Sequence, residues 1–154
     1  MKKAIDTAVG AILLPYYRVG GRRVLQPPFL TRVQTDGSFG RAHGGGRIAA
    51  VITESDGTRG AAQMVPAPRA RSSMEAEWAS VEFGLRMALE NDYEAVGIEN
   101  DCLGVVSAIM FPQNPLKQAY ARHYRAAIYD LTRQTLWTGV RWIPRSINRA
   151  DDLF

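Results

Sequence analysis

Short runs of apolar and β-branched residues, separated by turn signals, open the main part of the chain. Three runs predict strands at Leu30–Thr35, Arg47–Thr53 and Gly60–Val65, with a glycine-rich turn and a Ser-Asp-Gly turn between them. Because both connections are short, these strands are expected to form an antiparallel meander. Pro66 and Pro68 interrupt the pattern and mark its end.

Apolar residues then recur at every third or fourth position, which is the spacing of an amphipathic helix. This helix begins near Ser72 or Ser73, since either hydroxyl can accept a hydrogen bond from a free backbone amide of the first turn. Its apolar positions continue to Leu89. The chain therefore changes from strands to a long helix after the meander.

The remaining pattern alternates strands with helices. It predicts strands at Ala95–Ile98 and Val140–Ile143, a small helix that ends before Pro112, a longer helix over Leu116–Arg133, and a helix that begins at Asn148. The order is β-β-β-α-β-α-α-β-α, which is typical of an α/β fold. We expect a mixed five-stranded sheet, made of an antiparallel meander plus two parallel strands, with helices on both faces. The first, fourth and fifth strands should be parallel neighbours near its centre.

Residues 1–28 have a different pattern and are predicted to be an N-terminal extension of a domain that covers residues 29–154. The Gly20-Gly21 pair lies between β-prone runs and allows a hairpin, while a short helix over residues 4–14 is an equally good interpretation. The extension either packs on the domain or forms a basic arm for nucleic acid. Its apolar stretch is too short to span a bilayer, so no membrane association is expected.

Composition and charge add two constraints. The 154 residues carry a formal net charge of +4 with a pI near 9.5, mostly from arginine, which favours an anionic partner. Cys102 is the single cysteine, so an intrachain disulfide and a cysteine-based zinc site are excluded. A reducing, cytoplasmic setting fits this composition best.

Acidic residues follow the strands that should lie side by side. Asp36 follows the first strand, Asp101 follows the fourth, and Glu77 lies in the first turn of the helix that leads to the fourth. Asp151 and Asp152 lie where the last helix begins. Carboxylates gathered at one edge of a sheet repel one another unless a cation neutralises them, and oxygen ligands suit Mg²⁺ or Mn²⁺. The sequence therefore predicts a metal centre.

Four segments in this order resemble the ribonuclease H type 1 family, which is ribonuclease H-like and reverse-transcriptase-like. The resemblance covers residues 29–154 and is carried by Thr35-Asp36-Gly37-Ser38 with Gly44-Gly45-Gly46, by Ala76-Glu77 with Gly84-Leu85, by Asn100-Asp101-Cys102, and by Trp142-Ile143-Pro144-Arg145 with Asn148 and Ala150-Asp151-Asp152-Leu153. Each segment alone is a weak signal, whereas the four together at workable intervals are specific.

The resemblance implies a metal-dependent endonuclease that cuts the RNA strand of an RNA–DNA hybrid with two Mg²⁺ or Mn²⁺ ions. It implies that Asp36 bridges both ions, that Glu77 and Asp101 complete one site, and that a terminal aspartate completes the other. The hybrid is expected to lie across its minor groove, where 2′-hydroxyls mark the RNA strand. The expected substrate contacts are Gly37, Ser38, Gly44, Ser72, Ser73, Arg145 and Asn148.

The identity of the fourth ligand stays open between Asp151 and Asp152. Counting residues from Asn148 favours Asp152, whereas the phase of the expected helix favours Asp151, which we prefer. Glu77 is preferred to Glu75 because its spacing to the Gly-Leu pair matches the family pattern. Only two residues follow these aspartates, so we expect that segment to fray and the second metal site to be weak.

Two other functions remain possible. One is a binding module that keeps the fold with a weak or inactive site, which the short terminal segment favours. The other is a related nuclease on the same fold that acts on DNA structures. The intact set of Asp36, Glu77 and Asp101 favours the ribonuclease.

Overall fold

The computed structural model of the chain describes residues 15–19, 22, 23, 27 and 29–154. The predicted antiparallel meander is present as β3 (Thr31–Gly40), β4 (Gly45–Thr53) and β5 (Arg59–Ala67). Between β3 and β4 the chain turns through a short 3-10 helix, η1 (Arg41–His43), and then Gly44. The φ of Gly44 is 77°, in the left-handed region that favours glycine.

β3 extends five residues further than the sequence pattern indicates. Its antiparallel pairing with β4 continues to Gly40↔Gly45, whereas its parallel pairing with β6 stops at Thr35↔Asn100. Asp36 therefore lies within a strand, which corrects the expectation that it follows one. It is the first residue of β3 beyond the last pair with β6, where the sheet opens on that side.

The parallel strands at the centre of the sheet are those that the sequence predicted. β6 (Ala95–Asn100) lies between β3 and β7 (Trp137–Trp142) and is parallel to both. The first, fourth and fifth strands of the prediction are thus adjacent, and the carboxyl ends of β6 and β7 meet at Asn100↔Trp142.

Over the described residues the sheet has seven strands, in the order β2-β1-β7-β6-β3-β4-β5, where the sequence predicted five. The two additional strands are β1 (Tyr17–Arg18), which pairs with β7, and β2 (Arg22–Arg23), which pairs with β1. They occupy the edge of β7 that five strands would leave open. The hairpin interpretation is confirmed by the β1–β2 pairing, and the alternative helix over residues 4–14 lies outside the described residues. The division of the chain at residue 28 stays a prediction.

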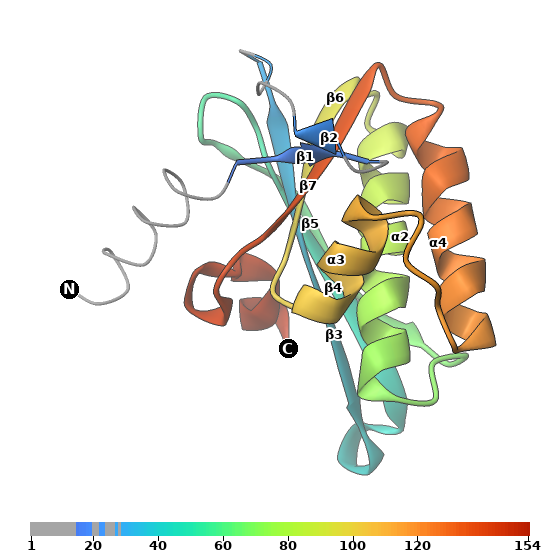
Figure 1. Ribbon diagram of the computed structural model, residues 1–154. Helices are drawn as coiled ribbons and strands as arrows, with labels where there is room; N and C mark the ends of the chain where they lie inside the picture. Colours follow the sequence, from blue (N-terminus) through green and yellow to red (C-terminus); the bar gives the residue numbers. More distant parts are fainter. Residues whose placement is uncertain (1–14, 20–21, 24–26, 28) are drawn as a thin grey trace.

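In the described part of the chain, three α-helices cover one face of the sheet: α2 (Ser73–Glu90), α3 (Leu103–Met110) and α4 (Ala119–Thr132). Ser72 caps α2, because its Oγ accepts a hydrogen bond of 3.1 Å from the amide of Glu75. In Figure 1, α2 and α4 lie side by side along the sheet. The large core between them and the strands includes Val33, Ile52, Trp78, Val81, Leu85, Ile98, Val105, Ile109, Ile128 and Val140.

The opposite face is covered by the C-terminal segment, which contains the 3-10 helices η2 (Arg145–Ile147) and η3 (Arg149–Leu153) (red in Figure 1). Ala150 is fully buried against Ala49 and Val51 of β4. Helices on both faces are therefore confirmed, although the terminal one is a 3-10 helix. No helix in the described part of the chain is long and apolar enough to cross a membrane.

Candidate metal centre

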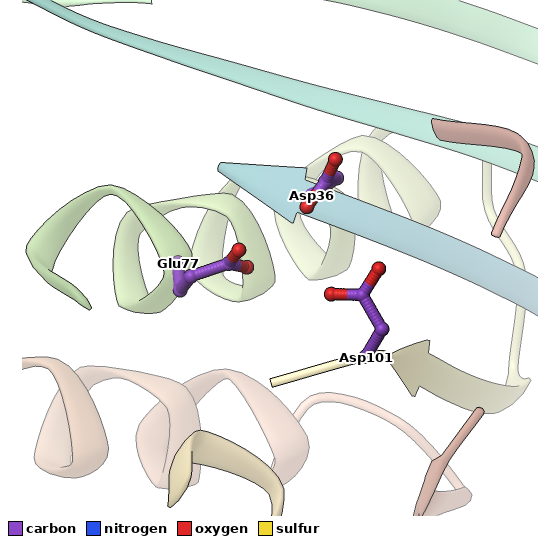
Figure 2. A group of neighbouring side chains, drawn as sticks. All are labelled: Asp36, Glu77 and Asp101. Carbon is purple, nitrogen blue, oxygen red and sulfur yellow. The ribbon is translucent and has the colours of Figure 1, made fainter. Parts of the chain in front are cut away.

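Three acidic side chains from three elements converge where β6 ends and β3 continues. Asp36 lies on β3, Glu77 on the second turn of α2 rather than on the first as expected, and Asp101 directly after β6. Each offers one carboxylate oxygen, and these oxygens lie within 4.8 Å of one another. Figure 2 shows the three carboxylates pointing toward one another. We call this group the acid cluster.

Close packing of α2 against β3 brings Glu77 to Asp36. A Cβ atom on Gly37 would lie 2.3 Å from the backbone carbon of Ala76, and one on Gly84 would lie 2.4 Å from Cγ2 of Thr35. Both distances are far below van der Waals contact, so any larger residue would push the helix from the strand. The glycines of the Asp-Gly-Ser and Gly-Leu segments therefore set the distance between the two carboxylates.

Neutral groups of the protein donate hydrogen bonds to the acid cluster. The Nδ2 group of Asn100 donates to Glu77 Oε2 at 3.2 Å, and the amide of Gly37 donates to the same oxygen at 3.3 Å. Asn148 donates from Nδ2 to Asp101 Oδ2 at 3.3 Å and to the carbonyl of Thr35 at 2.9 Å. These donors orient the carboxylates but bring no positive charge to them.

The acid cluster is electrostatically unfavourable by itself. Burial, followed by the charges of Glu77 and Asp101, raises the pKa of Asp36 to about 9. Burial is also the largest cause that raises the pKa of Glu77 to about 7, against the opposing hydrogen bond from Asn100. Burial raises the pKa of Asp101 as well. Carboxyl groups that resist ionisation at neutral pH have a large amount to gain from a bound cation.

Asp151 and Asp152 lie on different sides of η3. Asp151 lines the same cavity as Asp36, Glu77 and Asp101, and its proximity contributes to the raised pKa of Asp36. Asp152 lines a separate cavity on the far side of η3. Asp151, and not Asp152, therefore lies where it can extend the acid cluster.

Arg145 lies at the open side of the acid cluster. Its Nε and Nη2 atoms each lie 3.4 Å from a carboxylate oxygen of Asp151, and its side chain is 80% exposed. It is thus an accessible cation beside the acids, joined only loosely to one of them.

The other predicted substrate contacts have differing surroundings. Ser38 and Gly37 line the cavity of the acid cluster, and Ser73 is exposed at the start of α2. Ser72 uses its hydroxyl to cap α2. Asn148 is buried, and its Oδ1 accepts from the amide of Ala150. Gly44, Ser72 and Asn148 therefore have structural roles, and their contact with a substrate stays a prediction.

Sequence reasoning assigned no role to Asn100, although it precedes Asp101 in the third segment. Its Nδ2 donates to Glu77 and to two oxygens of Thr35, while its Oδ1 accepts from the amide of Cys102 at 2.7 Å. An asparagine directly before Asp101, at the end of a buried strand, was the available signal. Its buried amide joins β3, α2 and the start of α3 around the acids.

The donor set fits a hard divalent cation. It consists of carboxylate oxygens alone, which suits Mg²⁺ or Mn²⁺ and not the softer ions that select thiolate or imidazole. Glu75 is absent from the acid cluster, since its carboxylate accepts a hydrogen bond from the amide of Arg71 at the start of α2. The preference for Glu77 over Glu75 agrees with this geometry.

Comparison with known proteins places this fold and site in a family context. A family described as reverse transcriptase-like matches residues 34–154, which include all the acidic residues considered above. No curated protein matches the chain in sequence.

Three solved structures to which the chain is similar are ribonucleases H or ribonuclease H domains. The chain is similar to ribonuclease H1 of the archaeon Halobacterium salinarum, with a TM-score of 0.73 and 21% identity over 80% of this chain and 93% of that one. It is similar to the N-terminal ribonuclease H domain of a Mycobacterium tuberculosis protein, with a TM-score of 0.73 and 22% identity over 81% and 90% of the two chains. LC11-RNase H1 in complex with an RNA/DNA hybrid gives a TM-score of 0.69 and 20% identity over 80% and 92%.

Proposed function

Because the chain belongs to the reverse transcriptase-like family, with a ribonuclease H-like fold, we propose that it is a metal-dependent endonuclease that hydrolyses the RNA strand of RNA–DNA hybrids. The observation that carries the proposal is the acid cluster, in which three carboxylates lie within 4.8 Å of one another, while Arg145, the one cation that lines their cavity in the described part of the chain, pairs with Asp151 and not with these three. A solely structural role would leave their mutual repulsion without compensation.

Asp36, Glu77 and Asp101 are the proposed metal ligands, and Asp151 is proposed to complete a second site next to Asp36. The position of Asp151 in the same cavity as Asp36, whereas Asp152 lines a different one, supports this choice over Asp152. Two Mg²⁺ or Mn²⁺ ions held there would activate water and stabilise the leaving oxygen of a phosphodiester.

The neighbouring residues would act on the ligands and on the substrate. Asn100 and Asn148 hold Glu77 and Asp101 by hydrogen bonds, so they are positioning residues. The exposed guanidinium of Arg145 can turn from Asp151 to a phosphate of the substrate, which it would bind through two N–H groups.

An RNA–DNA hybrid is the proposed substrate for three reasons. The sequence segments resemble those of ribonucleases H, a relative of the same fold has been solved with an RNA/DNA hybrid, and the chain has a net charge of +4. Ser38 and Ser73 offer accessible hydroxyls near the acid cluster, and these can reach groove or backbone atoms. The unpaired Cys102 supports a reducing, cytoplasmic setting.

The deciding experiment measures cleavage of an end-labelled RNA–DNA hybrid in Mg²⁺ or in Mn²⁺, with duplex RNA and duplex DNA as parallel substrates. The proposal expects cleavage of the hybrid alone, at internal positions of the RNA strand. In the variant Asp36→Asn we expect the rate to fall by about 10²–10³-fold or more, the scale seen when one electrostatic contributor to the transition state is lost. Equal cleavage by Asp36→Asn would refute the proposal, and binding without cleavage would favour the binding-module alternative.

Asp151→Asn and Asp152→Asn form a matched pair, because each removes one charge from adjacent positions of η3. We expect Asp151→Asn to show the larger loss of rate and a higher Mg²⁺ requirement. The opposite order would assign the fourth ligand to Asp152 without affecting the other three.

A further inference from the structure

A second cavity lies between the sheet and the C-terminal segment. Its volume is about 550 Å³, larger than that of the cavity at the acid cluster. Four arginines from four different elements line it: Arg32 of β3, Arg59 of β5, Arg141 of β7 and Arg149 of η3. We call it the arginine cavity. It is separate from the cavity of the acid cluster. Asp152 lines the arginine cavity, whereas its neighbour Asp151 lines the cavity of the acid cluster.

Glu99 lies at the inner wall of the arginine cavity and is 1% exposed. Its Oε2 accepts hydrogen bonds from the hydroxyl of Tyr16 at 2.6 Å and from Nε of Arg141 at 2.7 Å, and Nη2 of Arg141 forms an ion pair with it. Its Oε1 accepts from Nε2 of Gln34 at 3.0 Å. Arg141 therefore balances the charge of Glu99, and both carboxylate oxygens have close partners.

The remaining arginines leave an excess of positive charge. Arg32 approaches Glu99 only to 3.9 Å and is 36% exposed. Within the described part of the chain, Arg59 and Arg149 form no ion pair. Asp152 is the one other acid that lines the cavity, and it is exposed. Three guanidinium groups thus face one cavity with a single carboxylate left to balance them.

This arrangement suits an anion with several oxygens. Guanidinium groups bind phosphate oxygens through paired N–H donors, and they do so more strongly in a concave site that is partly shielded from water. The volume lies within the range of small-molecule sites, so a phosphate-bearing group of nucleotide size has room. Gln34, Ser146 and Asn148 add polar groups to the lining.

We propose that the arginine cavity is a binding site for a phosphate group, which Arg32, Arg59 and Arg149 contact directly. The phosphate belongs either to a free phosphate ester or to the backbone of a nucleic-acid strand. The site is independent of the proposed nuclease activity. Because Arg149 belongs to η3, a phosphate that it contacts also stabilises the segment that carries Asp151.

The test is isothermal titration of the full chain in EDTA, in a buffer free of phosphate and sulfate. One arm uses inorganic pyrophosphate, and the other a short oligothymidylate that has only backbone phosphates. Saturable binding of one equivalent is expected in at least one arm, and the arm that binds identifies the source of the phosphate. Arg59→Gln and Arg149→Gln should each weaken binding about tenfold, the scale of one lost charge-assisted contact.

Two matched variants make the result specific. Lys117→Gln removes the same charge from an exposed site outside the cavity and should leave the affinity within about twofold. Asp152→Asn removes an acid from the cavity and should tighten binding. Neither arginine contributes to the core, so thermal unfolding is expected to show folded proteins throughout. The absence of binding in both arms, or equal losses for Arg59→Gln and Lys117→Gln, would overturn the proposal.

Discussion

Glu99 and Asp101 are two residues apart, yet their carboxylates have opposite environments. Glu99 is completely buried and has close contacts with Arg141, Tyr16 and Gln34. Asp101 faces Asp36 and Glu77, and its nearest donor is the neutral amide of Asn148. The charge of a carboxylate that pairs with a buried arginine is already neutralised, whereas a cluster of carboxylates without such a partner has affinity for an external cation. Charge balance distinguishes the structural acid from the candidate metal ligands.

The largest expected effect comes from removing the cation of the balanced site. Arg141→Met leaves Glu99 buried without its partner, so the free energy of unfolding should fall by about 3–5 kcal/mol. Urea denaturation followed by circular dichroism measures this loss. The double variant Glu99→Gln, Arg141→Met should recover part of it, because the buried charge is gone. A loss below about 1 kcal/mol in the single variant would contradict the assignment of Glu99 as a tightly balanced acid.

A smaller effect is expected from the neutral donor of the unbalanced site. Asn148→Ala removes the hydrogen bond to Asp101, so the Mg²⁺ concentration for half-maximal cleavage should rise about 10- to 100-fold, as for other groups that orient metal ligands. Asn91→Ala is a matched control, since it removes a side-chain hydrogen bond to the carbonyl of Met87 at the end of α2, remote from the acids. An equal Mg²⁺ requirement in the two variants would show that Asn148 has only a structural role.

Replacing the acid by its amide should change the free energy of unfolding in opposite directions at the two sites in metal-free protein. Asp36→Asn removes a carboxyl group whose ionisation is opposed in the folded protein, and we expect it to raise the free energy of unfolding at pH 8 by about 1–2 kcal/mol, allowing for the solvent that reaches the cluster. Glu99→Gln weakens the contact with Arg141 and should lower the free energy of unfolding. Excess Mg²⁺ should stabilise the wild type more than Asp36→Asn. If both variants changed the free energy of unfolding in the same direction in EDTA, the distinction between the two sites would be wrong.

The smallest effect is a pH dependence of stability. The pKa values of Asp36 and Glu77 are raised to about 9 and about 7, above their unfolded values, so the folded protein binds more protons than the unfolded chain. This stabilisation is complete below about pH 4 and is lost as the pH rises through 7 and 9. In EDTA the free energy of unfolding should therefore decrease from pH 6 to pH 9, by about 1 kcal/mol in total once screening by the solvent that reaches the cluster is allowed for. Repeating the urea titrations with Mg²⁺ should flatten this slope, while a rising curve in EDTA would exclude the proposed repulsion.

Local pattern was sufficient for the elements and for most of the acid cluster. Alternating and helical periodicities depend on neighbouring residues, so the meander, the parallel strands and the helices on both faces were predictable. Asp36, Glu77 and Asp101 stood in short segments with small residues beside them, and those glycines proved to set the contact between α2 and β3. The length of β3 was underestimated because pairing with β4, rather than the residues of β3 alone, carries the strand past Asp36.

By itself, the sequence determined the α/β fold and the three acids that meet, since both follow from spacing along the chain. The tertiary structure alone separated Asp151 from Asp152, because η3 is a 3-10 helix that directs adjacent residues to different cavities. It also added β1 and β2 to the sheet and paired Tyr16 and Arg141 with Glu99. These contacts join residues 42 and 83 positions apart. Partners so distant are chosen by packing of the whole molecule, and no local pattern specifies them.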